Sequence, residues 1–108
     1  MTFDECFERF VDISEKISLE DIDTAYVQIN IIGKDSGCFY LHIAENKMEV
    51  CRGEYKDRNV QWIFTLPAFA RILDGIMEPI YAYTTGKFKM MGDINLGRTL
   101  LVRISRLT

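Results

Sequence analysis

The period of the hydrophobic pattern changes twice along the chain, and this restricts the possible folds more than any other feature. Between about residues 25 and 64, apolar and polar side chains alternate, whereas before and after this region apolar residues recur every three or four positions. A period of two is typical of half-buried strands, and a period near 3.6 is typical of amphipathic helices. The sequence therefore predicts a helix, then a group of strands, then a mainly helical second half.

Residues 3–17 are predicted to form the first helix. Thr2 and Glu5 have the spacing of a capping box, in which hydroxyl and carboxylate each accept a hydrogen bond from a backbone amide at the start of the helix. Behind this cap, apolar residues follow at helical spacing: Phe3, Phe7, Phe10, Ile13 and Ile17. The acidic segment 18–24 that follows is predicted to be a linker.

Four strands are predicted in the alternating region, at residues 25–32, 38–44, 48–51 and 60–64. Turns rich in glycine or polar residues separate the first three, and a charged loop precedes the fourth. Because these connections are short, we expect an antiparallel meander with one buried face.

The second half returns to helical spacing with one strand between helices. A short helix is predicted from four apolar residues that follow Pro67, namely Phe69, Ile72, Leu73 and Ile76. A second helical turn begins at Glu78-Pro79, and residues 86–93 alternate as a half-exposed strand. Asp93 is placed to cap a last helix over about residues 94–107.

Length and charge limit the classes of function. The 108 residues fit one domain, 1–108, and no apolar run approaches the roughly 20 residues of a membrane-spanning helix. Residues 1–25 hold eight acids and two bases, a net charge of −6, whereas residues 86–108 hold five bases and one acid, a net charge of +4. So few bases predict no nucleic-acid partner. We expect the basic end to be a solvated face, with transient contact to anionic lipid headgroups as the alternative.

The residues that could carry catalysis or bind a metal are sparse. Cys6, Cys38 and Cys51 form no metal-ligand motif and are expected to be buried free thiols, and His42 lies in mid-strand, too far along the strand from Cys38 for a hydrogen bond. We therefore expect no metal, no cofactor and no enzyme activity. The N-terminus lacks the pattern of a secretory signal and the C-terminus lacks a peroxisomal one, so a cytoplasmic location is expected.

One stretch of the second half resembles a known family. Gly75, Glu78-Pro79, Ala82-Tyr83 and the string Gly86-Lys87-Phe88-Lys89-Met90-Met91-Gly92-Asp93, followed by an apolar helix, resemble the sterol carrier protein type 2 (SCP-2-like) family. The resemblance implies an α+β fold with a five-stranded, mostly antiparallel sheet covered by helices on one side. It also implies an apolar tunnel between sheet and helices that takes fatty acyl, sterol or isoprenoid lipids without catalysis. We expect this tunnel to lie under the C-terminal helix, with the lipid tail entering between that helix and the sheet and the helix acting as a lid.

Carried over by position, the resemblance implies which residues line the tunnel and meet the ligand's headgroup. The implied walls are Trp62, Phe64, Phe69, Ile72, Leu73, Ile76, Tyr83, Phe88, Met90, Leu100, Leu101 and Ile104. Lys87 and Lys89 would lie near the mouth, where they meet a carboxylate or phosphate or simply form an exposed strand face. The alternative function is an accessory or assembly protein that binds a partner protein through the apolar groove.

Overall fold

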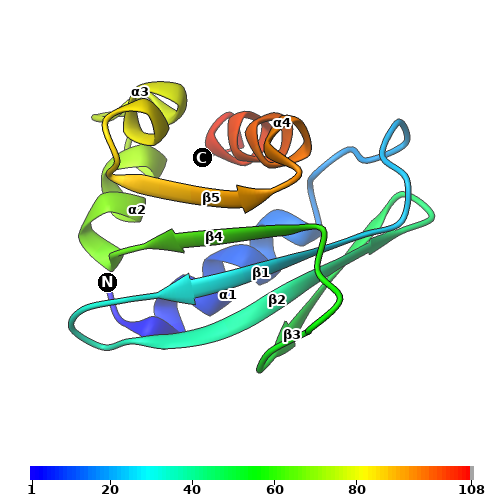
Figure 1. The fold of residues 1–108 in the computed structure, drawn as a ribbon, viewed down its shortest axis with the longest axis horizontal. Helices are drawn as coiled ribbons and strands as arrows, with labels where there is room; N and C mark the ends of the chain where they lie inside the picture. The colour runs from blue at the N-terminus through cyan, green and yellow to red at the C-terminus, as the bar shows by residue number, and fades with distance from the viewer. Residues whose placement is uncertain (108) are drawn as a thin grey trace.

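The computed structural model describes residues 1–107, which form four helices and a five-stranded sheet (Figure 1). In chain order the elements are α1 (Phe3–Ser14), β1 (Ala25–Ile31), β2 (Gly37–Ala44), β3 (Lys47–Arg52), β4 (Val60–Phe64), α2 (Leu66–Leu73), α3 (Pro79–Thr84), β5 (Phe88–Gly92) and α4 (Ile94–Ser105). The predicted elements are confirmed in type and order. The two long helices end earlier than predicted, at Ser14 and Ser105.

The sheet is mixed, with strand order β3-β2-β1-β4-β5. Three of its neighbouring pairs are antiparallel, but β1 and β4 are parallel. The expected meander therefore holds only for β1, β2 and β3, and its extension to β4 is wrong. The prediction of a five-stranded, mostly antiparallel sheet is confirmed.

The loop before β4 explains the parallel pairing. After β3 it crosses the sheet, where the Tyr55 ring stacks on the Tyr26 ring at 3.8 Å and the Tyr55 amide donates to Oε1 of Gln28 at 2.8 Å. Asn59 then fixes the chain to β1, because its amide donates to the Tyr26 carbonyl and its side chain accepts from the Tyr26 amide. Gln28 is fully buried and satisfied beneath this loop, although its sequence pattern placed it on the polar face.

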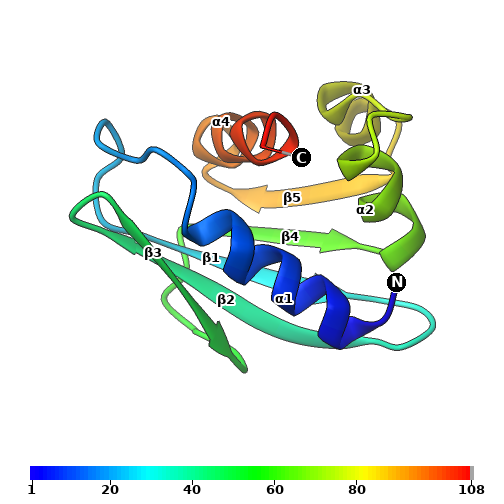
Figure 2. The same cartoon turned by 180° about the vertical axis from the view of Figure 1, so that it is seen from behind.

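All four helices lie over one face of the sheet (Figures 1 and 2). α1 packs against β2 and β3, and its Phe10 ring meets Phe39 of β2 edge-on at 5.2 Å. α4 covers β4 and β5 and approaches them at Gly97, because an added side chain there would meet Met90, Trp62 and Val60. The opposite face, with Tyr26, carries the loop before β4 and no helix.

Local caps set the helix ends as the sequence predicts. The Thr2 hydroxyl accepts from the Glu5 amide at 3.1 Å while the Glu5 carboxylate accepts from the Thr2 amide at 2.9 Å. Asp93 accepts from the Leu96 amide at 3.1 Å and starts α4. α2 ends at Leu73, and Gly75 adopts a positive φ of 74° just beyond it. This turn places Ile76 outside the helix, so its assignment to the helix is wrong.

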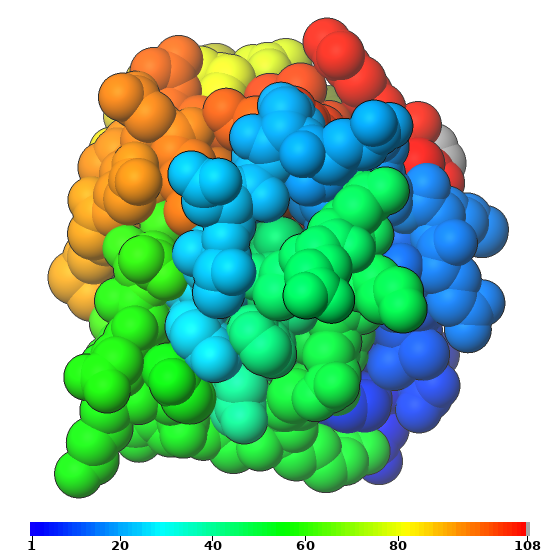
Figure 3. Space-filling view, turned by 90° about the vertical axis from the view of Figure 1, so that its right-hand side faces the viewer, coloured from blue at the N-terminus to red at the C-terminus, as the bar shows by residue number. Residues whose placement is uncertain are grey.

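The segment 18–24 is held by both halves of the chain. Figure 3 shows it against α4 and the β2–β3 turn. The Leu19 amide donates to Oδ1 of Asn46 at 2.7 Å, and Asp21 accepts two hydrogen bonds from the Arg103 guanidinium, at 2.6 and 2.8 Å. The predicted linker is therefore a fixed connection between α1, the sheet and α4.

We predict that Gly92→Ala destabilises the fold more than Gly86→Ala. Both glycines have positive φ, 92° and 78°, but only at Gly92 would the new Cβ collide with the Asn59 carbonyl oxygen. We expect Gly86→Ala to lower the free energy of unfolding by about 1 kcal/mol and Gly92→Ala by about 2–4 kcal/mol, measured by urea denaturation. Equal losses would contradict the collision.

Candidate functional site

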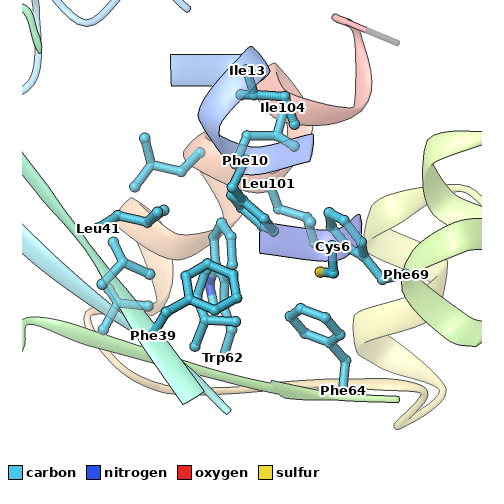
Figure 4. Packing of buried hydrophobic residues seen from close by; sticks show 14 of the residues in the cluster. Cys6, Phe10, Ile13, Phe39, Leu41, Trp62, Phe64, Phe69, Leu101 and Ile104 are labelled. Atoms are coloured by element: carbon cyan, nitrogen blue, oxygen red, sulfur yellow. The ribbon is translucent and has the colours of Figure 1, made fainter. Parts of the chain in front are cut away.

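Ten of the twelve predicted wall residues are buried in the space between the sheet and the helices. They are Trp62, Phe64, Phe69, Ile72, Leu73, Phe88, Met90, Leu100, Leu101 and Ile104. Figure 4 shows several of them pointing toward the same interior as Phe10 from α1. Tyr83 is half-buried, and Ile76 is 67% exposed. The predicted set is therefore brought together, apart from Ile76, and its role as a tunnel wall stays a prediction.

Aromatic rings occupy this interior in mutual contact. The Phe64 ring stacks on Phe69 at 4.9 Å and on Phe88 at 4.8 Å, and Trp62 meets Phe88 edge-on at 5.5 Å. The Trp62 indole N–H is a buried donor without a partner among residues 1–107. These rings occupy part of the interior in which the tunnel is predicted.

A groove of about 650 Å³ opens between α2, α3 and the segment that joins them. Its volume lies within the range of ligand pockets, about 300–1,000 Å³. The lining is mainly apolar, with two cations at the rim, and comprises Thr65, Pro67, Ala68, Arg71, Ile76, Met77, Glu78, Tyr81 and Lys87. Sequence reasoning did not find this groove. The one sequence feature that points to it is the pair Gly75 and Pro79, two turn-forming residues at which the chain folds back beside α2.

The charged side chains that line the groove differ in their contacts. The Glu78 carboxylate accepts hydrogen bonds from the Ile80 and Tyr81 amides at 3.0 and 2.8 Å and so caps α3. Lys87 and Arg71 are exposed and form no ion pair among the described residues. Lys87, one of the two predicted headgroup contacts, lines the groove. Lys89, the other, is exposed on β5 between buried Phe88 and Met90 and is not among the lining residues.

A second groove of about 550 Å³ lies between α3 and α4. Ile80 lines it from α3, and α4 contributes Asn95, Arg98, Thr99, Val102, Arg103 and, at its end, Arg106. The Arg103 guanidinium beside Asp21 holds the pKa of that carboxyl below its usual range. Arg98 and Arg106 are exposed.

Comparison with known proteins decides the family. The SCP-2 sterol transfer family matches residues 3–101, most of the chain. The chain belongs to this family. Membership supports a lipid-binding or lipid-transfer module in general terms, and it agrees with the SCP-2-like resemblance in the sequence.

Individual relatives of this SCP-2 chain are distant. Hydroxysteroid dehydrogenase-like protein 2 of Mus musculus is 28% identical over 92 residues, covering 82% of this chain and 19% of that protein. The chain thus spans about a fifth of the length of the curated relatives it matches. A double mutant of the sec-alkyl sulfatase PisA1 superposes with a TM-score of 0.73 at 15% identity, over 87% of this chain and 16% of that one. Palmitated SCP2L2 from Aedes aegypti gives 0.69 at 17% identity, over 96% and 95% of the two chains.

The three cysteines and the single histidine of this SCP-2 chain lie apart from both grooves. Cys6 is buried as expected, but Cys38 and Cys51 are only half-buried, which corrects the prediction for them. His42 stacks on Tyr26 at 4.5 Å on the sheet face away from the helices. Residues 1–107 contain no group of three or more His, Cys, Asp or Glu that could hold a metal. Within the same residues, no helix is long and apolar enough to span a bilayer.

We predict that Cys6 resists alkylation in the folded protein. Burial raises the pKa of the Cys6 thiol to about 12, so at pH 8 almost none of it is the reactive thiolate. With iodoacetamide, mass mapping should find Cys6 modified roughly a thousandfold more slowly than an exposed thiol, until urea unfolds the chain. Cys38 and Cys51 should react first, and a Cys6→Ala variant should keep those early sites. Equal rates at Cys6 and Cys51 would contradict this.

Proposed function

We propose that this chain is a non-catalytic carrier for a long-chain hydrophobic ligand such as a fatty acyl, sterol or isoprenoid lipid. The observation that carries the proposal is the mainly apolar α2–α3 groove on a chain of the SCP-2 sterol transfer family. A relative solved in a palmitated form adds support for a fatty acyl ligand. The charged side chains of the groove favour binding, because Glu78 caps α3 and Lys87 and Arg71 are exposed cations that can meet an anionic headgroup.

In this proposal the ligand tail first lies along the exposed apolar residues of the groove. Ile76 and Tyr81 are 67% and 57% exposed, and their position together in one groove supports their role as a binding surface. Met77 is half-buried beside them, and its unbranched side chain adapts to ligands of different shape. Lys87 and Arg71 then meet a carboxylate or phosphate at the rim.

To reach the interior walled by the predicted residues, the tail must move past α2, which lies between the two spaces. Phe69 and Ile72 on the inner face of α2 are buried, whereas Pro67 and Arg71 on its outer face line the groove. Each methylene removed from water contributes about 0.8 kcal/mol, so about ten supply about 8 kcal/mol before the costs of association. Only the surplus over those costs appears as affinity, so a micromolar complex, about 8 kcal/mol net, needs a longer tail or headgroup contacts as well.

We predict that Ile76→Asp weakens binding of a fluorescent long-chain fatty acid by at least about tenfold. The substitution removes apolar contact worth about 1.5–3 kcal/mol and places a negative charge beside the tail. Because Ile76 is mostly exposed, the melting temperature should stay within a few degrees of the parent protein. Affinity is measured by fluorescence titration.

Ile32→Asp is the matched control, since Ile32 is also a large exposed apolar residue, 48% exposed, in the turn after β1. It should leave the affinity unchanged. Equal affinities for the parent and Ile76→Asp would exclude the groove as the site. Native mass spectrometry of freshly purified protein tests the accessory alternative, which a stable protein complex without lipid would favour.

A further inference from the structure

We propose that the outer surface of α3 and α4 docks on an anionic phospholipid bilayer and turns the α2–α3 groove toward it. This surface, called here the basic helical face, consists of Ile80, Asn95, Arg98, Thr99, Val102, Arg103 and Arg106. The inference rests on the proposed carrier function, because a carrier must meet the membrane that supplies or receives its lipid.

The charge of α4 is one-sided. Residues Ile94–Ser105 contain two arginines and no acid, and Arg106 follows directly. Arg98 and Arg106 are exposed, and within residues 1–107 neither forms an ion pair. Arg103 is different, because Asp21 holds it through two hydrogen bonds. Two guanidinium groups are therefore free to bind phosphates, which they recognise in bidentate fashion.

The shape and lining of the basic helical face suit a lipid surface. Arg98, Arg103 and Arg106 surround a hollow of about 550 Å³ that also contains Val102 and Ile80. The arginines can pair with the phosphate of a lipid headgroup, and the apolar side chains of the hollow can contact the carbons next to that phosphate.

The basic helical face also adjoins the proposed mouth. Consecutive residues of α3 line the two grooves, Ile80 on the α4 side and Tyr81 on the α2 side. Both helices lie at the same side of the molecule, above β5 in Figure 1. A bilayer against α4 would therefore also meet exposed Tyr81 and Ile76, and Lys87 at the groove rim.

The charge of α1 favours this orientation. α1 carries exposed acids, including Asp4, Glu8 and Asp12, and its residues Phe3–Ser14 hold four acids and one base, a net charge of −3, against +4 for residues 86–108. An anionic surface attracts the second region and repels the first over about a Debye length, about 8 Å at physiological salt.

The test is co-sedimentation of the whole chain with two kinds of vesicle, phosphatidylcholine alone and phosphatidylcholine mixed with phosphatidylglycerol. The parent protein should bind the anionic vesicles more strongly, and added salt should weaken this binding. Arg98→Gln combined with Arg106→Gln should weaken it at least about tenfold. Lys34→Gln combined with Lys56→Gln removes the same charge from exposed loops elsewhere and should change binding less than about twofold.

Equal binding of the parent to both vesicles, or equal losses in the two double variants, would overturn the docking surface. Competition by inorganic phosphate at the concentration of the lipid phosphate would also overturn it, in favour of a soluble phosphate ligand.

Uptake of the fluorescent fatty acid from solution separates this inference from the carrier function. The Arg98 and Arg106 double variant should keep that uptake; if the parent shows none while its vesicle binding stands, the carrier function fails and the docking surface remains.

Discussion

A continuous series of aromatic contacts holds α1 and α2 to the sheet. It runs from Phe39 on β2 to Phe10 on α1, then to Phe69 on α2, Phe64 on β4 and Phe88 on β5, with ring centroids 4.8–5.2 Å apart. Each such pair contributes about 0.5–1.5 kcal/mol beyond the area it buries. Elements from both halves of the chain therefore share one packed layer, and this layer positions α2, which forms one wall of the α2–α3 groove.

Sequence patterns could predict most of the elements but not how the sheet is ordered. Alternation identifies β4, because Val60, Trp62 and Phe64 share one face, yet a strand shows the same alternation in a parallel or an antiparallel pair. The pairing of β4 with β1 depends on Asn59 and Tyr55, which act through contacts across the sheet. Such contacts leave no periodic signal, so loop length alone wrongly favoured a meander.

In the candidate site, too, some features could be predicted from the sequence and others could not. The buried wall residues could be predicted because family position and apolar period agree, as for Leu100 and Ile104 on α4. Ile76 could not be placed, since it continues the apolar spacing of α2 but follows a turn at Gly75 that carries it to the surface. The groove depends on this reversal of the chain, which is a property of backbone geometry rather than of hydrophobic period. Likewise, composition shows the basic C-terminal segment, but only the structure shows that Asp21 engages Arg103.

The packing that stabilises the fold also occupies the space a lipid tail needs. If a tail separates two ring pairs around Phe64, the lost contacts cost about 1–3 kcal/mol, which the burial of about two to four methylenes offsets. A long chain can therefore open this interior, whereas a ligand of only a few carbons gains too little. Met77 beside the groove and Met90 beneath α4 ease the change, because unbranched side chains refill irregular space at small cost. Under the proposed carrier function, ligand length, rather than a cavity already open in the interior, would set which lipids can bind.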